Sequence, residues 1–105
     1  MTWRVRLTRE ARADLERLFD FILERELARD GSDLLLAEKA LAAIRAGFET
    51  LRSSPFTCRK AARSPFLREL IIPFGRSGYV ALLEIEDASH VLIVAVRHQL
   101  EDDYH

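Results

Sequence analysis

The chain has 105 residues, of which 49% are hydrophobic and 31% are charged, and its formal net charge is −1. These values are typical of a single globular domain over residues 1–105, and they exclude a disordered or repetitive chain. No stretch approaches the roughly 20 apolar residues of a membrane helix, and the lone Cys58 cannot form an internal disulfide. We therefore expect a cytoplasmic protein that uses no metal or cofactor and does not bind membranes.

Charge is distributed unevenly along the sequence. Residues 52–76 hold six basic residues against Glu69 alone, whereas residues 8–51 hold ten acidic and seven basic residues. Proteins that bind nucleic acid usually carry a much larger overall positive charge, because each phosphate they neutralise increases affinity. The near-zero total therefore argues against direct binding of nucleic acid by this chain.

The first predicted elements are a strand and a helix. Residues 2–7 alternate between polar and apolar side chains, the pattern of a strand with one buried face. Thr8 is a suitable N-cap for the helix that follows, in which apolar residues recur every three or four positions as far as Ile22. Gly31 is expected to end this helix as a left-handed C-cap.

A second helix is predicted after Ser32 or Asp33, either of which can serve as its N-cap. Its apolar seam recurs at spacings of three and four, and consists of Leu34, Ala37, Leu41, Ile44, Phe48 and Leu51. The helix should end before Pro55, because the residue that precedes a proline is disfavoured in helical geometry. The short connection predicts an antiparallel helical hairpin.

Three strands are expected in the second half of the chain, over residues 66–72, 79–86 and 91–96. Pro73 and the turn at residues 75–78 should separate the first two, and residues 55–65, which lack any period, should form a loop. The predicted order is β-α-α-β-β-β. It indicates an α+β fold in which the helical hairpin packs on one face of a mainly antiparallel four-stranded sheet.

Residues 91–96 are apolar on both faces of the strand they form. Since two helices can cover only one face of a four-stranded sheet, something else should cover the other face. A protein partner would do so, because a large exposed apolar patch on a small domain usually marks an interaction site. Alternatively, sheet curvature and the loop at residues 55–65 close over it.

The chain resembles the RelE/ParE superfamily of type II toxin–antitoxin toxins, and specifically its ParE-like branch. The resemblance rests on the element order, on the run from Leu7 to Leu15 and on the segments 67–70, 73–79, 94–99 and 102–104. It implies a small cytoplasmic toxin that a ParD-like antitoxin binds and neutralises, as a homodimer or a heterotetramer with that antitoxin. ParE-like members are held to inhibit DNA gyrase, whereas RelE-like members cut messenger RNA on the ribosome.

A ribonuclease would need a base, an acid and cations around the scissile phosphate. The candidate catalytic set is Arg63, Arg68, Arg76, Arg97, His98 and Tyr104. RelE-like ribonucleases resemble one another in a crowd of basic residues, but this chain has only two lysines, Lys39 and Lys60. Carboxylates at residues 101–103 would also repel a phosphate backbone beside the would-be acid.

An inhibitor needs no proton-transfer pair and instead needs a few anchor side chains, for which arginine and tyrosine are favoured. The predicted partner-binding residues are Arg76, Tyr79, Arg97, His98, Gln99 and Tyr104. The sequence thus favours a gyrase inhibitor that is not an enzyme. The alternatives left open are a RelE-like, ribosome-dependent mRNA endoribonuclease and a binding module without toxic activity.

Overall fold

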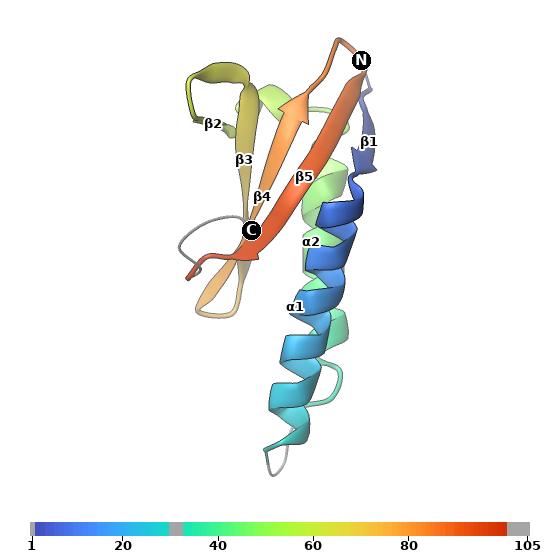
Figure 1. Cartoon of the computed structure of the whole chain (residues 1–105), viewed down its shortest axis with the longest axis vertical. Helices are drawn as coiled ribbons and strands as arrows, with labels where there is room; N and C mark the ends of the chain where they lie inside the picture. The colour runs from blue at the N-terminus through green and yellow to red at the C-terminus, as the bar shows by residue number, and fades with distance from the viewer. Residues whose placement is uncertain (1, 30–32, 101–105) are drawn as a thin grey trace.

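The computed structural model describes residues 2–29 and 33–100. Two α-helices, a short 3-10 helix (η1) and five strands follow one another along the chain (Figure 1). Their bounds are β1 Arg4–Leu7, α1 Arg9–Leu27, α2 Leu36–Thr50, η1 Pro55–Thr57, β2 Arg59–Ala61, β3 Ser64–Phe74, β4 Ser77–Ile85 and β5 His90–His98.

Thr8 joins β1 directly to α1, as the sequence predicts. Its side-chain oxygen accepts a hydrogen bond from the Ala11 N–H at 3.0 Å, which satisfies one of the unpaired donors at the helix N-terminus. The same hydroxyl donates to the carbonyl of Val94 at 3.2 Å. One residue therefore caps the helix and attaches the start of that helix to β5.

The connection between the helices is held by the buried carboxylate of Glu26. It accepts hydrogen bonds from the Arg29 guanidinium at 2.9 Å and from the Asp33 N–H at 3.1 Å. The Asp33 side chain accepts from the Leu35 N–H at 3.0 Å in the turn before α2, but Leu35 is the N-cap of that helix, so the predicted N-cap at Asp33 is wrong. The caps predicted at Gly31 and Ser32 lie outside the described residues.

The second helix begins later than its apolar seam suggests. Leu34 lies before α2 and is 50% exposed, so its predicted place in the buried seam is wrong. Ala37, Ile44, Phe48 and Leu51 are confirmed as core residues, whereas Leu41 is only half-buried. Gly47 lets α2 approach β3 closely, because a Cβ atom there would lie 2.9 Å from the Ile72 side chain.

The sheet has five strands in the order β1-β5-β4-β3-β2, so the expectation of four strands is wrong, although the α+β class is confirmed. Residues 59–61, predicted as loop, pair with β3 as the additional strand β2. The sheet is mixed, because β1 runs parallel to β5 while the other neighbours are antiparallel. The α1–α2 hairpin covers one face of it (Figure 1).

β3 continues through Pro73 to Phe74, beyond the end that the sequence predicts. Phe74 pairs with Ser77 across a two-residue turn in which Gly75 has a φ of 62°. In such a hairpin, the next residue, Pro73, turns its nitrogen away from β4. A proline there costs no ladder hydrogen bond, since β2 does not extend that far along β3.

The reverse face of the sheet, opposite the helices, is only partly covered. Val80 and Ala95 are 2% and 3% exposed, whereas Ile71 is 39% exposed. The predicted closure of this face by residues 55–65 is wrong. Those residues instead extend the sheet and place the ring of Phe56 against Trp3 and Phe66 at one end of the helix-covered side.

Candidate functional site

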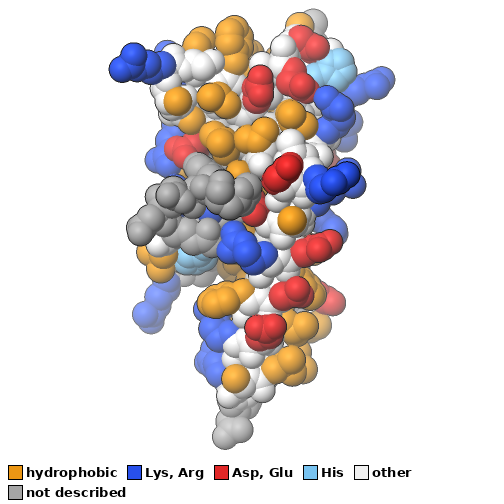
Figure 2. Space-filling model, in the orientation of Figure 1, with side chains coloured by type: hydrophobic (Ala, Val, Ile, Leu, Met, Phe, Trp, Pro, Cys, Tyr) orange, Lys and Arg blue, Asp and Glu red, His pale blue; other side chains and the backbone are white. Residues whose placement is uncertain are grey.

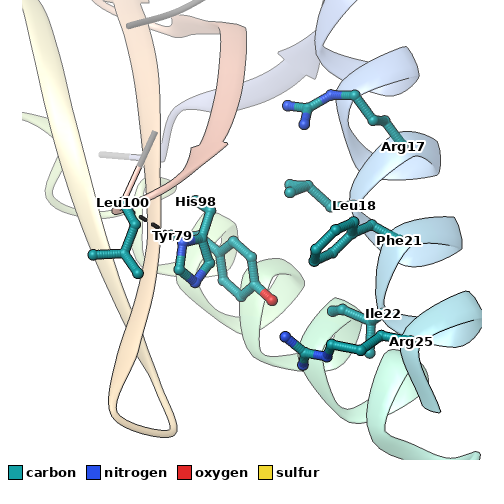
Figure 3. Close-up of a pocket in the computed structure, with 8 residues that line it drawn as sticks. All are labelled: Arg17, Leu18, Phe21, Ile22, Arg25, Tyr79, His98 and Leu100. Atoms are coloured by element: carbon teal, nitrogen blue, oxygen red, sulfur yellow. Dashed lines mark hydrogen bonds between the residues drawn. The ribbon is translucent and has the colours of Figure 1, made fainter. Parts of the chain in front are cut away.

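A groove of about 420 Å³ separates α1 from the paired ends of β4 and β5 (Figure 3). We call it the α1 groove. It is lined by Arg17, Leu18, Phe21, Ile22, Arg25, Tyr79, His98 and Leu100. The two arginines reach in from the helix, while the tyrosine and histidine rings face them from the sheet (Figure 3).

The sheet side of the groove is built from a cross-strand pair. Tyr79 on β4 lies opposite His98 on β5, and their rings meet edge to face with centroids 5.6 Å apart. Such aromatic pairs hold each ring in one orientation. Burial raises the pKa of the Tyr79 hydroxyl, an effect that the positive charge of Arg25 partly opposes.

Both ring nitrogens of His98 are occupied. The backbone N–H of Leu100 donates to Nδ1 at 3.2 Å, so Nδ1 acts as an acceptor. The other nitrogen, Nε2, lies 2.9 Å from the hydroxyl oxygen of Ser77 and is then the protonated donor of this pair. An imidazole held in this way orients neighbouring groups, and neither nitrogen faces the groove as a free base.

The helix side of the groove combines an aromatic ring with cations. Phe21 is 60% exposed, an unusual position for a large apolar side chain. The guanidinium of Arg25 lies 5.7 Å from the centre of its ring, a cation–π distance. The groove is therefore apolar at its centre and positive along α1.

The structure divides the predicted partner-binding residues among several places. Tyr79 and His98 lie in the α1 groove, but Arg97 is on the reverse face, because it pairs in register with Val80 rather than with Tyr79. The Arg97 guanidinium donates to the carbonyls of His98 and Gln99 at 3.2 and 3.4 Å.

Arg76 is exposed in the β3–β4 turn. The backbone N–H of Gln99 donates a hydrogen bond to the Gly78 carbonyl at 2.9 Å. Tyr104 lies outside the described residues. Of the predicted partner-binding set, the groove thus receives one tyrosine and one histidine.

The remaining candidates for a ribonuclease site are also dispersed. Arg68 lies opposite Leu83, four residues along β4 from Tyr79, so it is about 13 Å from the groove at the usual strand rise. Its guanidinium donates to the carbonyls of Pro65, Phe56 and Cys58 at 2.7, 3.1 and 2.9 Å. Arg63 is exposed in the turn between β2 and β3.

Sequence reasoning missed the helix side of the groove entirely. Phe21 offered a signal, because it lies off the apolar stripe of α1, with Arg17 one turn before it and Arg25 one turn after it. Arg17 and Arg25 gave none, since charges on the outer face of a helix are ordinary.

Within residues 2–29 and 33–100 we find no cluster of three or more histidine, cysteine or acidic side chains placed to hold a metal ion. Neither described helix has the length and apolar character needed to cross a bilayer.

The described structure is a two-helix hairpin on one face of a small mixed sheet, with a groove beside the first helix. The family model of the ParE toxin of the type II toxin–antitoxin system parDE matches residues 5–103. The chain therefore belongs to the ParE toxin family, and the predicted resemblance is confirmed.

One solved structure with the same fold comes from the chromosomal ParDE toxin–antitoxin system of P. aeruginosa, with a TM-score of 0.68 and 19% sequence identity. The match covers 92% of this chain and 96% of that one. No curated protein matches the chain.

Proposed function

We propose that this ParE toxin inhibits DNA gyrase by binding it through the α1 groove, without catalysing a reaction, and that a ParD-like antitoxin neutralises it. Family membership supports the toxin role. The observation that carries the binding mechanism is the groove itself, in which exposed Phe21 lies between cations and an ordered Tyr79–His98 pair. Buried-aromatic and arginine anchors of this kind dominate protein–protein affinity.

The state of the polar groups supports binding rather than catalysis. Both ring nitrogens of His98 already have hydrogen-bond partners, and the Arg68 guanidinium donates to backbone carbonyls far from the groove. RNA cleavage needs a proton acceptor and cations around one phosphate. Among the described residues, the predicted catalytic set does not form such a cluster, because Arg63, Arg68 and Arg97 all lie outside the groove that holds His98.

The test is a supercoiling assay with purified gyrase and increasing concentrations of the toxin. We expect loss of supercoiling, and Phe21→Ala should raise the concentration for half inhibition about tenfold, the scale of one lost anchor. Phe66→Ala is the matched control, because Phe66 is similarly exposed, at 52%, but lies near the far end of the sheet. Normal supercoiling at saturating toxin would refute gyrase inhibition.

The ribonuclease alternative is tested in the same preparation by primer extension on messenger RNA from translating ribosomes. We expect the RNA to remain intact. Site-specific cuts that disappear in a His98→Ala variant would replace the gyrase mechanism with RelE-like cleavage.

A further inference from the structure

The helix side of the α1 groove is a single row of three side chains. Arg17, Phe21 and Arg25 are spaced four residues apart on α1, and all three line the groove. Residues at this spacing form a ridge along a helix surface, and eight residues correspond to about 12 Å along the helix axis. The groove therefore presents a cation, an aromatic ring and a second cation in line, over about two helical turns.

The charge of this row is not balanced within the groove. Among the described residues that line it, two are arginines and none is acidic. Arg25 forms no ion pair with another described residue, and its guanidinium lies against the Phe21 ring. Arg17 lies 3.9 Å from the Asp14 carboxylate, yet its side chain is 50% exposed. Figure 2 shows the acidic side chains on the lower half of α1 turned away from the sheet, with basic ones on the side nearer to it.

Between the two arginines the groove is apolar. The exposed ring of Phe21 stands beside Leu18 and Ile22, which are each 5% exposed and lie at the base of the groove. The edge-to-face pair of Tyr79 and His98 closes the opposite side. A ligand would therefore gain most by packing an apolar side chain on Phe21 while placing a carboxylate near each arginine.

The surroundings of the groove favour a helical ligand over an extended one. The outer edge of β5 beside it is already occupied at Val96, whose N–H donates to the Asp14 carboxylate at 2.9 Å. The sheet contributes the side chains of Tyr79 and His98 to the groove. An extended segment laid against these side chains would leave its own backbone groups unpaired, whereas a helix satisfies its backbone groups internally.

We propose that the α1 groove takes an amphipathic helix of gyrase that carries two acidic residues eight positions apart, with an apolar residue midway between them. A helix lying nearly parallel to α1 repeats the same interval of about 6 Å per four residues, so its acids meet Arg17 and Arg25 while its apolar residue packs on Phe21. This inference rests on the proposed gyrase target, and it names the chemistry by which that target is recognised.

The first test identifies the segment of gyrase that enters the groove. Leu100 lines the groove and is 79% exposed, so p-benzoylphenylalanine in its place puts a photo-cross-linker at the rim and leaves the row on α1 intact. The labelled toxin is checked for inhibition of supercoiling and then irradiated with gyrase, and the cross-linked gyrase peptide is sequenced by mass spectrometry. We expect a sequence with acidic, apolar and acidic residues at four-residue intervals.

The second test changes the charge at one end of the row. Arg25→Glu should raise the toxin concentration for half inhibition of supercoiling at least about tenfold, because repulsion replaces attraction in a partly desolvated contact. Arg25→Lys keeps the charge and should lose less than about threefold. Arg12→Glu is the matched control, because Arg12 is an exposed residue of α1 outside the groove, and this variant should inhibit as the native chain does.

The outcomes separate this inference from the proposed function. If the native chain inhibits gyrase but Arg25→Glu inhibits equally well, or if the cross-linked gyrase segment lacks the paired acidic residues, the inference is overturned and gyrase inhibition stands. An inhibitory labelled toxin that cross-links only to a second copy of itself, or not at all, overturns it in the same way. If the native chain leaves supercoiling normal, the proposed function and this inference fall together.

Discussion

The carboxylate of Asp14 provides a sharp test of how this fold is held together. β1 ends at Leu7, but β5 continues to His98, so in the described part of the chain the outer edge of β5 beyond Ile93 has no strand partner. Asp14, only 3% exposed, replaces that partner: its Oδ2 accepts the Val96 N–H at 2.9 Å. Replacing Asp14 should therefore weaken the contact between α1 and the sheet.

The expected magnitude follows from burial. Asp14→Ala removes a hydrogen bond with a charged acceptor and leaves the Val96 N–H buried without a partner, which together should cost about 2–3 kcal/mol of unfolding free energy. For a domain of this size, 1 kcal/mol corresponds to about 4–8 °C, so the Tm should fall by at least about 8 °C. Asp14→Asn retains an acceptor oxygen and should cost only about 1 kcal/mol.

Urea unfolding, followed through the fluorescence of the single tryptophan Trp3, measures these differences. Asp20→Ala is the matched control, because Asp20 lies on the same helix but is exposed, and its replacement should change stability by less than about 0.5 kcal/mol. If Asp14→Ala were as stable as that control, the carboxylate would not be what secures this edge of β5.

Two further predictions concern stability away from the groove. Arg68→Ala should lower the unfolding free energy by about 1–2 kcal/mol, because the carbonyls of Phe56, Cys58 and Pro65 lose their donor. Thermal unfolding measures this loss. Full stability in an Arg68→Lys variant would contradict the explanation, since one ammonium cannot span all three carbonyls. Hydrogen bonds from the Ser89 N–H and His90 lower the pKa of Asp87 from 3.8 to about 2, so its stabilising effect is present above pH 4 and is lost as the pH falls toward 2. The difference in Tm between the native chain and Asp87→Asn should accordingly shrink as the pH falls through 2, and a difference that did not shrink would show that the carboxylate acts through something other than its charge.

Local periodicity accounts for most of the fold that the sequence could predict. The two helices and the strand at residues 91–96 carry strong apolar patterns, and Thr8 is a cap whose role depends only on its neighbours. The strand β2 could not be found in this way. Its three residues have no apolar period, and its pairing with β3 is accompanied by the Arg59–Glu69 ion pair at 2.9 Å, a contact between residues ten positions apart.

The groove was harder to predict because it joins elements far apart in the chain. Arg97 and His98 are adjacent in sequence, but strand alternation places them on opposite faces of the sheet, and only His98 reaches the groove. Phe21 and Arg25 join it from α1, about 75 residues earlier in the sequence. The spacing of residues along the chain does not indicate which turn of a helix will face the end of a strand.

The short length of β1 explains how the α1 groove forms beside the sheet. Because β1 stops at Leu7 and Thr8 starts a helix at once, α1 crosses beside the second half of β5, with Asp14 closing the strand edge beneath it. The α1 groove forms where the helix then parts from the strand ends, near His98. A second cleft, of about 600 Å³ and lined by residues of β1 and α2, lies at the other end, where β1 is itself the edge of the sheet. A longer β1 would pair with the rest of β5 and fill the position from which α1 forms the groove.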